Sequence, residues 1–99
     1  MVYLVRTSEF MGDWDKAWSI LSDMIKYVGQ NYDQVKDSYL MTNIAGPTDQ
    51  VHWVLAFDSL ADEEKFAFKV FQDPKYMEAM RSTEGLMTAP VDRLYRREG

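Results

Sequence analysis

The clearest alternation of apolar and polar positions lies near the start of the chain and predicts a helix. Apolar side chains recur three or four positions apart, as on one face of an amphipathic helix, at Trp14, Ala17, Trp18, Leu21, Met24, Ile25 and Val28. Asp13 is a suitable N-cap, and Gly29 is placed to end the helix in a left-handed conformation. We therefore predict a helix from about residue 13 to about residue 29, with its apolar stripe facing a sheet.

Four other segments have strand composition, rich in β-branched and aromatic residues. They are VYLVRT (2–7), KDSYLMTNIA (36–45), VHWVLAF (51–57) and VDRLYRR (91–97). The turn-forming sequence GPTDQ separates the second segment from the third and predicts a hairpin. The arginine-rich last segment is typical of a charged edge strand that discourages unwanted sheet pairing.

A second helix is predicted after the third strand, because Ser59 and Asp62 have the spacing of a capping box. Within LADEEKFAFKVF, Leu60, Ala67 and Phe71 lie on one line along the helix, and Phe66 and Val70 lie beside that line. Asp73 and Pro74 close this helix and can open a short further helix. Its buried side would carry Tyr76, Met77 and Met80, and the following STEGLMTAP is expected to be a loop.

The order strand, helix, strand, strand, helix, strand predicts a single α+β domain over residues 1–99. Its fold class is ferredoxin-like βαββαβ, a four-stranded antiparallel sheet with helices on one face and the first and third strands central. The third strand is largely apolar on both sides, since Val51, Trp53, Leu55 and Phe57 lie on one side and His52, Val54 and Ala56 on the other. In a sheet with one solvent-exposed face, apolar and polar side chains alternate more regularly along each strand. We therefore predict a homodimer formed through the sheet faces.

Composition and charge narrow the possible partners. Hydrophobic residues make up 46% and charged residues 27% of the 99, as in folded proteins. The net charge of −5 argues against nucleic acid and anionic membrane surfaces as partners. The absence of cysteine excludes disulfides, thiolate metal sites and cysteine nucleophiles. No stretch has the length of a signal-peptide core or a membrane span, so we expect a cytoplasmic protein without membrane contact.

A strand running into FDSLADEEKF, with DPKYMEAM after the helix, resembles the dimeric α+β barrel superfamily, particularly its antibiotic-biosynthesis-monooxygenase-like and NIPSNAP-like members. The matching positions are Phe57, Asp58, Ser59, Leu60, Ala61, Asp62, Phe66, Asp73, Pro74 and Tyr76. The resemblance implies a dimer with a small pocket between sheet and helices in each subunit. Relatives include cofactor-free oxygenases, haem-degrading enzymes and isomerases. The haem branch uses a histidine in the second helix region, which this chain lacks, so we expect no haem and no other cofactor.

His52, the single histidine, is the first candidate catalytic residue, because an imidazole can act as a general base near neutral pH. The alternative is a hydrogen-bonded strand residue near the turn or the dimer interface, and the lack of an acid or nucleophile at a recognisable spacing favours it. Asn43 and Trp53 complete the candidate catalytic set. One histidine cannot supply a site of several imidazoles, and the carboxylates show no calcium-loop spacing, so no metal is expected.

Five further residues are candidates for contacting a small apolar or aromatic ligand. They are Tyr3, Arg6, Trp14, Trp18 and Tyr39. For the tryptophans the alternative is core packing, since they belong to the helix stripe. Arg6 in an apolar central strand should pair with a carboxylate, reach solvent or hold an anionic ligand, and pairing is favoured.

Two functions follow from these observations. The first is a cofactor-independent monooxygenase-like enzyme that acts on a small aromatic or polycyclic substrate, as the resemblance implies. The alternative is a non-catalytic module that binds a small apolar metabolite or only assembles as a dimer, because the residues form no convincing acid, base or nucleophile constellation.

Overall fold

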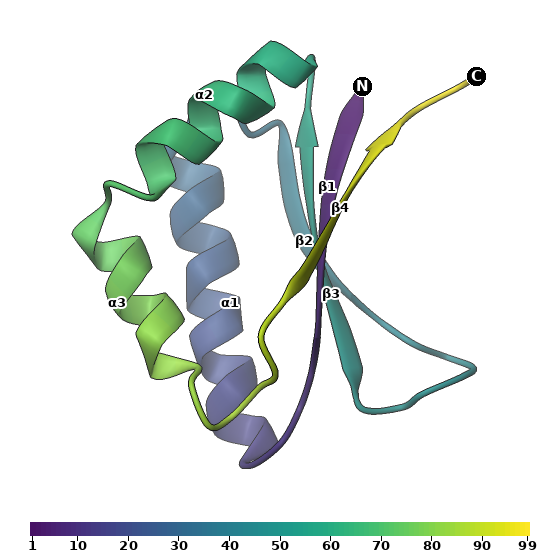
Figure 1. The fold of residues 1–99 in the computed structure, drawn as a ribbon, viewed down its shortest axis with the longest axis vertical. Coiled ribbons are helices and arrows are strands. Elements are labelled where there is room, and N and C mark those ends of the chain that lie inside the picture. Colours follow the sequence, from purple (N-terminus) through teal and green to yellow (C-terminus); the bar gives the residue numbers. More distant parts are fainter.

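The computed structural model describes residues 1–99 and shows one antiparallel sheet with three helices on one of its faces (Figure 1). In chain order the elements are β1 (Val2–Glu9), α1 (Trp14–Asn31), β2 (Asp37–Thr42), β3 (Gln50–Phe57), α2 (Leu60–Val70), α3 (Pro74–Ser82) and β4 (Val91–Arg96). The strand order β2-β3-β1-β4 places β1 and β3 in the centre. The predicted ferredoxin-like βαββαβ fold is confirmed, with α3 as a short addition before the last strand.

The predicted helix starts are confirmed by their caps. Asp13 accepts a hydrogen bond from the backbone N–H of Lys16 at 3.1 Å, and Ser59 accepts one from Asp62 at 3.2 Å. The prediction that Gly29 ends α1 is wrong, because the helix continues to Asn31 and Gly29 has no positive φ. α1 packs against β2 at this point, where Ser38 lies close to Gly29. Such tertiary contact overrides a local stop signal.

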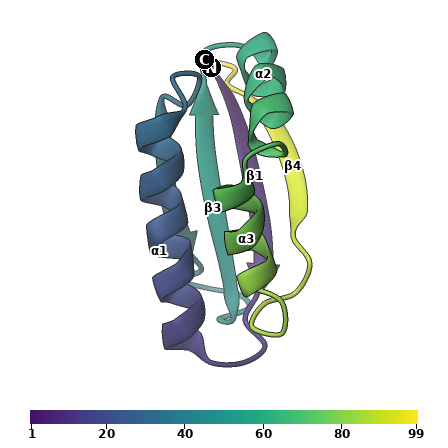
Figure 2. The same cartoon turned by 90° about the vertical axis from the view of Figure 1, so that its left-hand side faces the viewer.

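The core lies between the sheet and the helices, where the inward side of β3 meets all three helices. Its buried members include Trp53, Leu55 and Phe57 from β3, Met24 and Val28 from α1, Phe66 and Val70 from α2, and Tyr76 from α3. Figure 2 shows α1 on one side of this layer, with α2 and α3 on the other. The side of β3 that carries Val51, Trp53, Leu55 and Phe57 is therefore the one that faces the helices.

Some predicted core positions lie at the surface instead. Trp14 is 41% exposed, because the buried line of α1 runs through Ala17, Leu21, Met24 and Val28. Trp14 packs beside this line on Phe10, with ring centroids 3.8 Å apart, and stacks with Trp18 at 6.2 Å. Leu60 and Phe71 are also exposed, so α2 presents a narrower apolar face to the core than its sequence suggested.

The opposite face of the sheet has no helix over it (Figure 1). The strand register arranges the side chains of this face in three rows that cross the four strands. The first row is Asp37, Ala56, Tyr3 and Tyr95, the second is Tyr39, Val54, Val5 and Arg93, and the third is Met41, His52, Thr7 and Val91. Val54 and Ala56 are only 2% exposed within the single chain, so neighbouring side chains already cover them. Met41, Val91 and Tyr95 remain about half exposed. We call this surface the open sheet face.

Candidate functional site

The sheet separates the sequence-predicted site residues into two groups. Trp53 and Arg6 point toward the helices, whereas His52, Tyr3 and Tyr39 occupy the open sheet face. Asn43 follows β2 and joins His52 on that open side. Trp14 and Trp18 lie on the flank of α1 and line no pocket with the others. The predicted residues therefore do not form one constellation within a chain.

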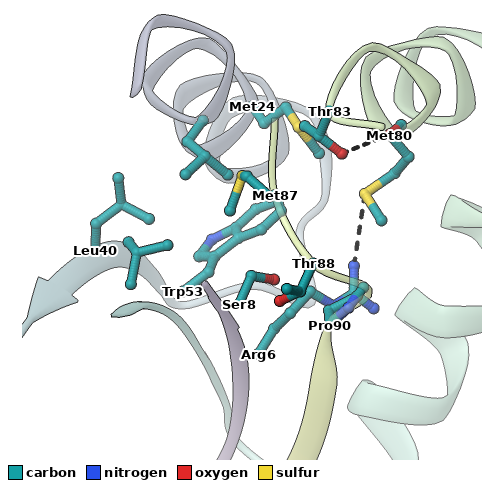
Figure 3. Close-up of a pocket in the computed structure, with 12 residues that line it drawn as sticks. Arg6, Ser8, Met24, Leu40, Trp53, Met80, Thr83, Met87, Thr88 and Pro90 are labelled. Atoms are coloured by element: carbon teal, nitrogen blue, oxygen red, sulfur yellow. Dashed lines mark hydrogen bonds between the residues drawn. The ribbon is translucent and has the colours of Figure 1, made fainter. Parts of the chain in front are cut away.

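A small cavity lies between the sheet and the helices, where the loop before β4 passes close to β1 (Figure 3). Its volume is about 30 Å³, and seven of its twelve lining residues are hydrophobic. Since one buried water occupies roughly 10–15 Å³ on this measure, the cavity holds about two waters. Met24, Met80 and Met87 contribute to its wall. These flexible side chains are suited to reshaping such a space.

Arg6 lies at one end of this cavity and is already fully engaged. Its guanidinium donates from Nε and Nη2 to the two carboxylate oxygens of Asp92, at 2.8 and 3.0 Å, and from Nη1 to the Tyr76 hydroxyl and, at 3.9 Å, toward the Met80 sulfur. Burial disfavours the charged form of Arg6, but Asp92 and Tyr76 outweigh it and raise the pKa of Arg6 above its usual range. Arg6 therefore pairs with a carboxylate, as the sequence favoured.

Ser8 is the cavity residue that sequence reasoning missed. Ser8 is on the inward face of β1 and is only 7% exposed, and its hydroxyl has no hydrogen-bond partner within the chain but keeps some contact with solvent. Trp53 lies beside it, with the indole N–H already donated to the Ser38 hydroxyl at 3.0 Å. The signal available in the sequence was a hydroxyl at an inward position of a central strand, two residues after Arg6. A hydroxyl that no protein group uses is available to water or to a ligand oxygen.

His52 belongs to a hydrogen-bonded chain on the open sheet face. The Asn43 amide nitrogen donates to the Pro47 carbonyl at 2.6 Å and to Gln50 Oε1 at 2.9 Å, which leaves Asn43 Oδ1 as an acceptor. His52 Nε2 therefore donates to Asn43 Oδ1 at 2.7 Å, and Nδ1 accepts from the Thr7 hydroxyl at 2.8 Å. We assign the Nε2–H tautomer on this basis. Both ring nitrogens are hydrogen-bonded within the chain, and the network stabilises the turn between β2 and β3.

A second polar cluster joins the end of α1 to the start of α3. The hydroxyls of Tyr27 and Tyr32 both donate to Asp73 Oδ2 at 2.6 Å, while Asp73 Oδ1 caps α3 by accepting from the backbone N–H of Lys75 at 2.9 Å. The tyrosine hydroxyls hold the pKa of Asp73 below its usual value. This cluster is fully satisfied internally and serves to fix the helices in place.

Neither a metal site nor a membrane span is present among residues 1–99. The structure contains no group of three or more His, Asp or Glu side chains arranged to hold a metal ion. None of its helices combines the length and the apolar character needed to cross a membrane.

Comparison with family models and with curated proteins gives no match, but solved structures match over nearly the whole chain. A NIPSNAP family protein of unknown function from Agrobacterium tumefaciens is 18% identical, with 96% of this chain and 86% of that chain covered and a TM-score of 0.75. SnoaB, a cofactor-independent oxygenase from Streptomyces nogalater, is 9% identical, with 99% and 93% covered and a TM-score of 0.78.

The chain shares its fold with these NIPSNAP and oxygenase structures. The fold part of the sequence resemblance is thus confirmed. A dimeric protein of unknown function and ferredoxin-like fold from Bacteroides fragilis also matches, at 12% identity and a TM-score of 0.63, with 96% of each chain covered. At such identities the likeness defines the architecture and leaves the activity to be argued from the site.

Proposed function

We propose that this protein is a homodimer that binds a small, partly apolar molecule in the cavity between the sheet and the helices of each subunit. The observation that carries the proposal is the unpaired hydroxyl of Ser8, a residue only 7% exposed, beside Trp53 in a mostly apolar cavity. Apolar walls with a few convergent polar groups are typical of ligand sites. Ser8 offers one donor and acceptor to a ligand oxygen, because no protein group uses it.

The size of the cavity limits the ligand. A cavity of roughly 150 Å³ accommodates benzene, whereas this one measures about 30 Å³. A single aromatic ring therefore requires the methionine side chains of Met80 and Met87 to move, and a fused polycyclic ring requires backbone displacement as well. Small phenols and quinols are the best matches, because they combine one ring with an oxygen for Ser8.

Cofactor-independent oxygenation is the activity to test at this site. SnoaB, which shares the fold, is such an oxygenase. In this chemistry an apolar pocket desolvates an acidic substrate, a polar group stabilises its enolate or phenolate, and dioxygen reacts with the electron-rich carbanion. Here Ser8 would donate to the developing oxyanion, and Trp53 would supply an apolar face for the ring.

Non-catalytic binding is the second candidate, and a specific observation favours it. A general base is missing from the cavity, since Arg6, the one ionisable residue in its lining, stays cationic, and His52 lies on the other side of the sheet. Saturable binding without turnover would support this second candidate. Oxygen consumption with anthrone-type or hydroquinone substrates, lost on Ser8→Val, would support the oxygenase.

Binding can be followed through Trp53 fluorescence in a Trp14→Phe, Trp18→Phe background. Titration with phenol and hydroquinone should give a saturable change. Ser8→Val should abolish it, because the variant removes the hydroxyl and fills space, whereas Ser19→Ala, on the exposed side of α1, should not. An unchanged response in Ser8→Val would contradict the proposed site.

The homodimer is supported by the open sheet face, where Met41, Val91 and Tyr95 are 46%, 53% and 51% exposed. Apolar side chains gathered on a face without a covering layer mark an interaction surface. The dimeric ferredoxin-like neighbour is consistent with it. Light scattering at micromolar concentration should give twice the 11.6 kDa chain mass. A monomeric mass would overturn this part of the proposal.

A further inference from the structure

A second recess lies on the helical side of the sheet, between α2 and the β1–β4 edge, and we call it the α2–β4 groove. Figure 2 shows α2 running beside β4 at this place. Its volume is about 220 Å³, well above that of the cavity beside Ser8. Arg6 is the residue shared by the two spaces, since its side chain lines both.

The floor and rim of the α2–β4 groove are apolar. Leu4, Phe66 and Val70 form a buried floor, with exposed fractions of 7%, 3% and 2%. Phe71 and Leu94 stand at the rim and are 58% and 50% exposed. An aromatic and an aliphatic side chain are thus left in water beside a recess that could bury the body of a single-ring compound.

The charges lining the α2–β4 groove are unbalanced. Arg6 is the one basic residue in the lining, and the bidentate ion pair with Asp92 neutralises it. Glu63 also lines the groove, is only partly exposed, and has neither an ion pair nor a side-chain hydrogen bond. One uncompensated carboxylate therefore faces an apolar recess.

Three effects raise the pKa of Glu63, namely burial first, then the nearby charges of Glu64 and Asp92. Burial disfavours a charge of either sign, whereas the neighbouring carboxylates of Glu64 and Asp92, together with Glu63 itself, favour a bound cation. An anionic ligand is disfavoured for the same reason, because Asp92 already occupies Arg6 and Glu63 would repel it. Aromatic side chains at the floor and rim add the possibility of cation–π attraction.

We propose that the α2–β4 groove binds an amphipathic ammonium compound, with its charged nitrogen against Glu63 and Asp92 and its apolar body on Phe66, Val70 and Leu94. The volume fits a single ring with a short alkylammonium arm, since roughly 150 Å³ is enough for benzene alone. This site is independent of the function proposed for the Ser8 cavity.

The test is an NMR titration of the full chain with 2-phenylethylammonium, monitoring backbone amide shifts. Saturable shifts at millimolar ligand should appear in α2 and β4. The neutral isostere 2-phenylethanol and the anion 3-phenylpropanoate should bind more weakly, the anion most weakly. Shifts centred on Ser8 and Trp53 instead would overturn the assignment to the α2–β4 groove, as would equal binding of the alcohol or no saturable binding.

Glu63→Gln and Glu64→Gln are a matched pair of variants, since they remove the same charge from adjacent positions of one helix and only Glu63 lines the groove. Glu63→Gln should weaken ammonium binding by about fivefold, the upper range for a solvent-accessible ion pair. Glu64→Gln should change it by less than about twofold, as expected for a more distant charge screened by salt. An equal effect of the two variants would contradict a specific contact.

A third variant tests the contact between the apolar body of the ligand and the α2–β4 groove. Leu94→Lys, at a half-exposed edge position, introduces a competing ammonium at the rim and should abolish binding of the probe while the remaining amide spectrum stays native. Undiminished binding in this variant would show that the probe does not use the α2–β4 groove.

Discussion

The ion pair between Arg6 and Asp92 allows a direct test of how much burial adds to a salt bridge in this fold. Asp92→Ala removes the carboxylate from a guanidinium whose side chain is only 13% exposed. Arg81 and Glu78 form a pair with the same 2.8 Å N–O distance, but with side chains 63% and 71% exposed. The two pairs differ in their contact with water, and Arg6–Asp92 is also bidentate, whereas Arg81 and Glu78 share one contact within a helix turn.

The expected loss in free energy of unfolding follows from how far water can reach each pair. Breaking a fully buried pair costs about 3–5 kcal/mol, whereas an exposed pair contributes about 0–1 kcal/mol. Asp92 is 43% exposed, so water can partly replace it, and an intermediate loss of about 2 kcal/mol is expected. In a domain of this size such a loss lowers Tm by roughly 8–16 °C. Glu78→Ala should cost less than about 0.5 kcal/mol.

The assay is urea unfolding at one fixed protein concentration, because self-association would make the stability depend on concentration. The change should appear as a lower midpoint with the same slope. Asp92→Asn, which keeps an acceptor for Arg6 but removes the charge, should fall between wild type and Asp92→Ala. Equal losses for Asp92→Ala and Glu78→Ala would refute the reasoning, since burial would then add nothing.

Three further predictions concern helix anchoring and the open sheet face. Asp73→Asn keeps an N-cap for α3 but weakens the tyrosine contacts, so it should lower the free energy of unfolding less than Asp73→Ala does. Because the pKa of Asp73 is lowered from 3.8, the stability that its carboxylate contributes is present above that pH and is lost as the pH falls through the lowered value. The free energy of unfolding should therefore depend less on pH in the acid range in Asp73→Asn than in the wild type. Ser59→Ala should cost about 1 kcal/mol by thermal unfolding, through loss of the cap to Asp62; an unchanged Tm would contradict the cap's role. Met41→Lys should shift light-scattering mass toward the monomer, whereas Leu60→Lys, similarly exposed at the start of α2, should not; equal behaviour would argue against the open sheet face as the interface.

The parts of the fold that local rules control could be predicted from the sequence. Side-chain caps at Asp13 and Ser59 act within three residues, and the alternation in β3 correctly separated Trp53 from His52 onto opposite faces of the sheet. The end of α1 could not be predicted in this way. It depends on packing against β2 and on the contact of Tyr32 with Asp73, 41 residues away.

The candidate site was less predictable, because its geometry depends on contacts between strands distant in sequence. Ser8 is a candidate only in the folded chain, where the segment that carries Met87 packs near it and its hydroxyl has no partner. The network of His52 likewise requires Thr7, 45 residues away, in register beside it. Neither relation leaves a spacing that a reader of one sequence could recognise.

The alternation of side chains along β3 constrains any account of the function. His52 and Trp53 are adjacent in sequence and therefore point to opposite faces of the sheet, so they cannot act on the same ligand within one subunit. A role for His52 has to involve the open sheet face, and hence the proposed dimer interface, whereas Trp53 and Ser8 serve the cavity under the helices. Asn43→Ala should then alter dimer stability and leave phenol binding intact, while Ser8→Val should do the reverse. If both variants impaired binding equally, the two faces would be coupled and the division into separate sites would be wrong.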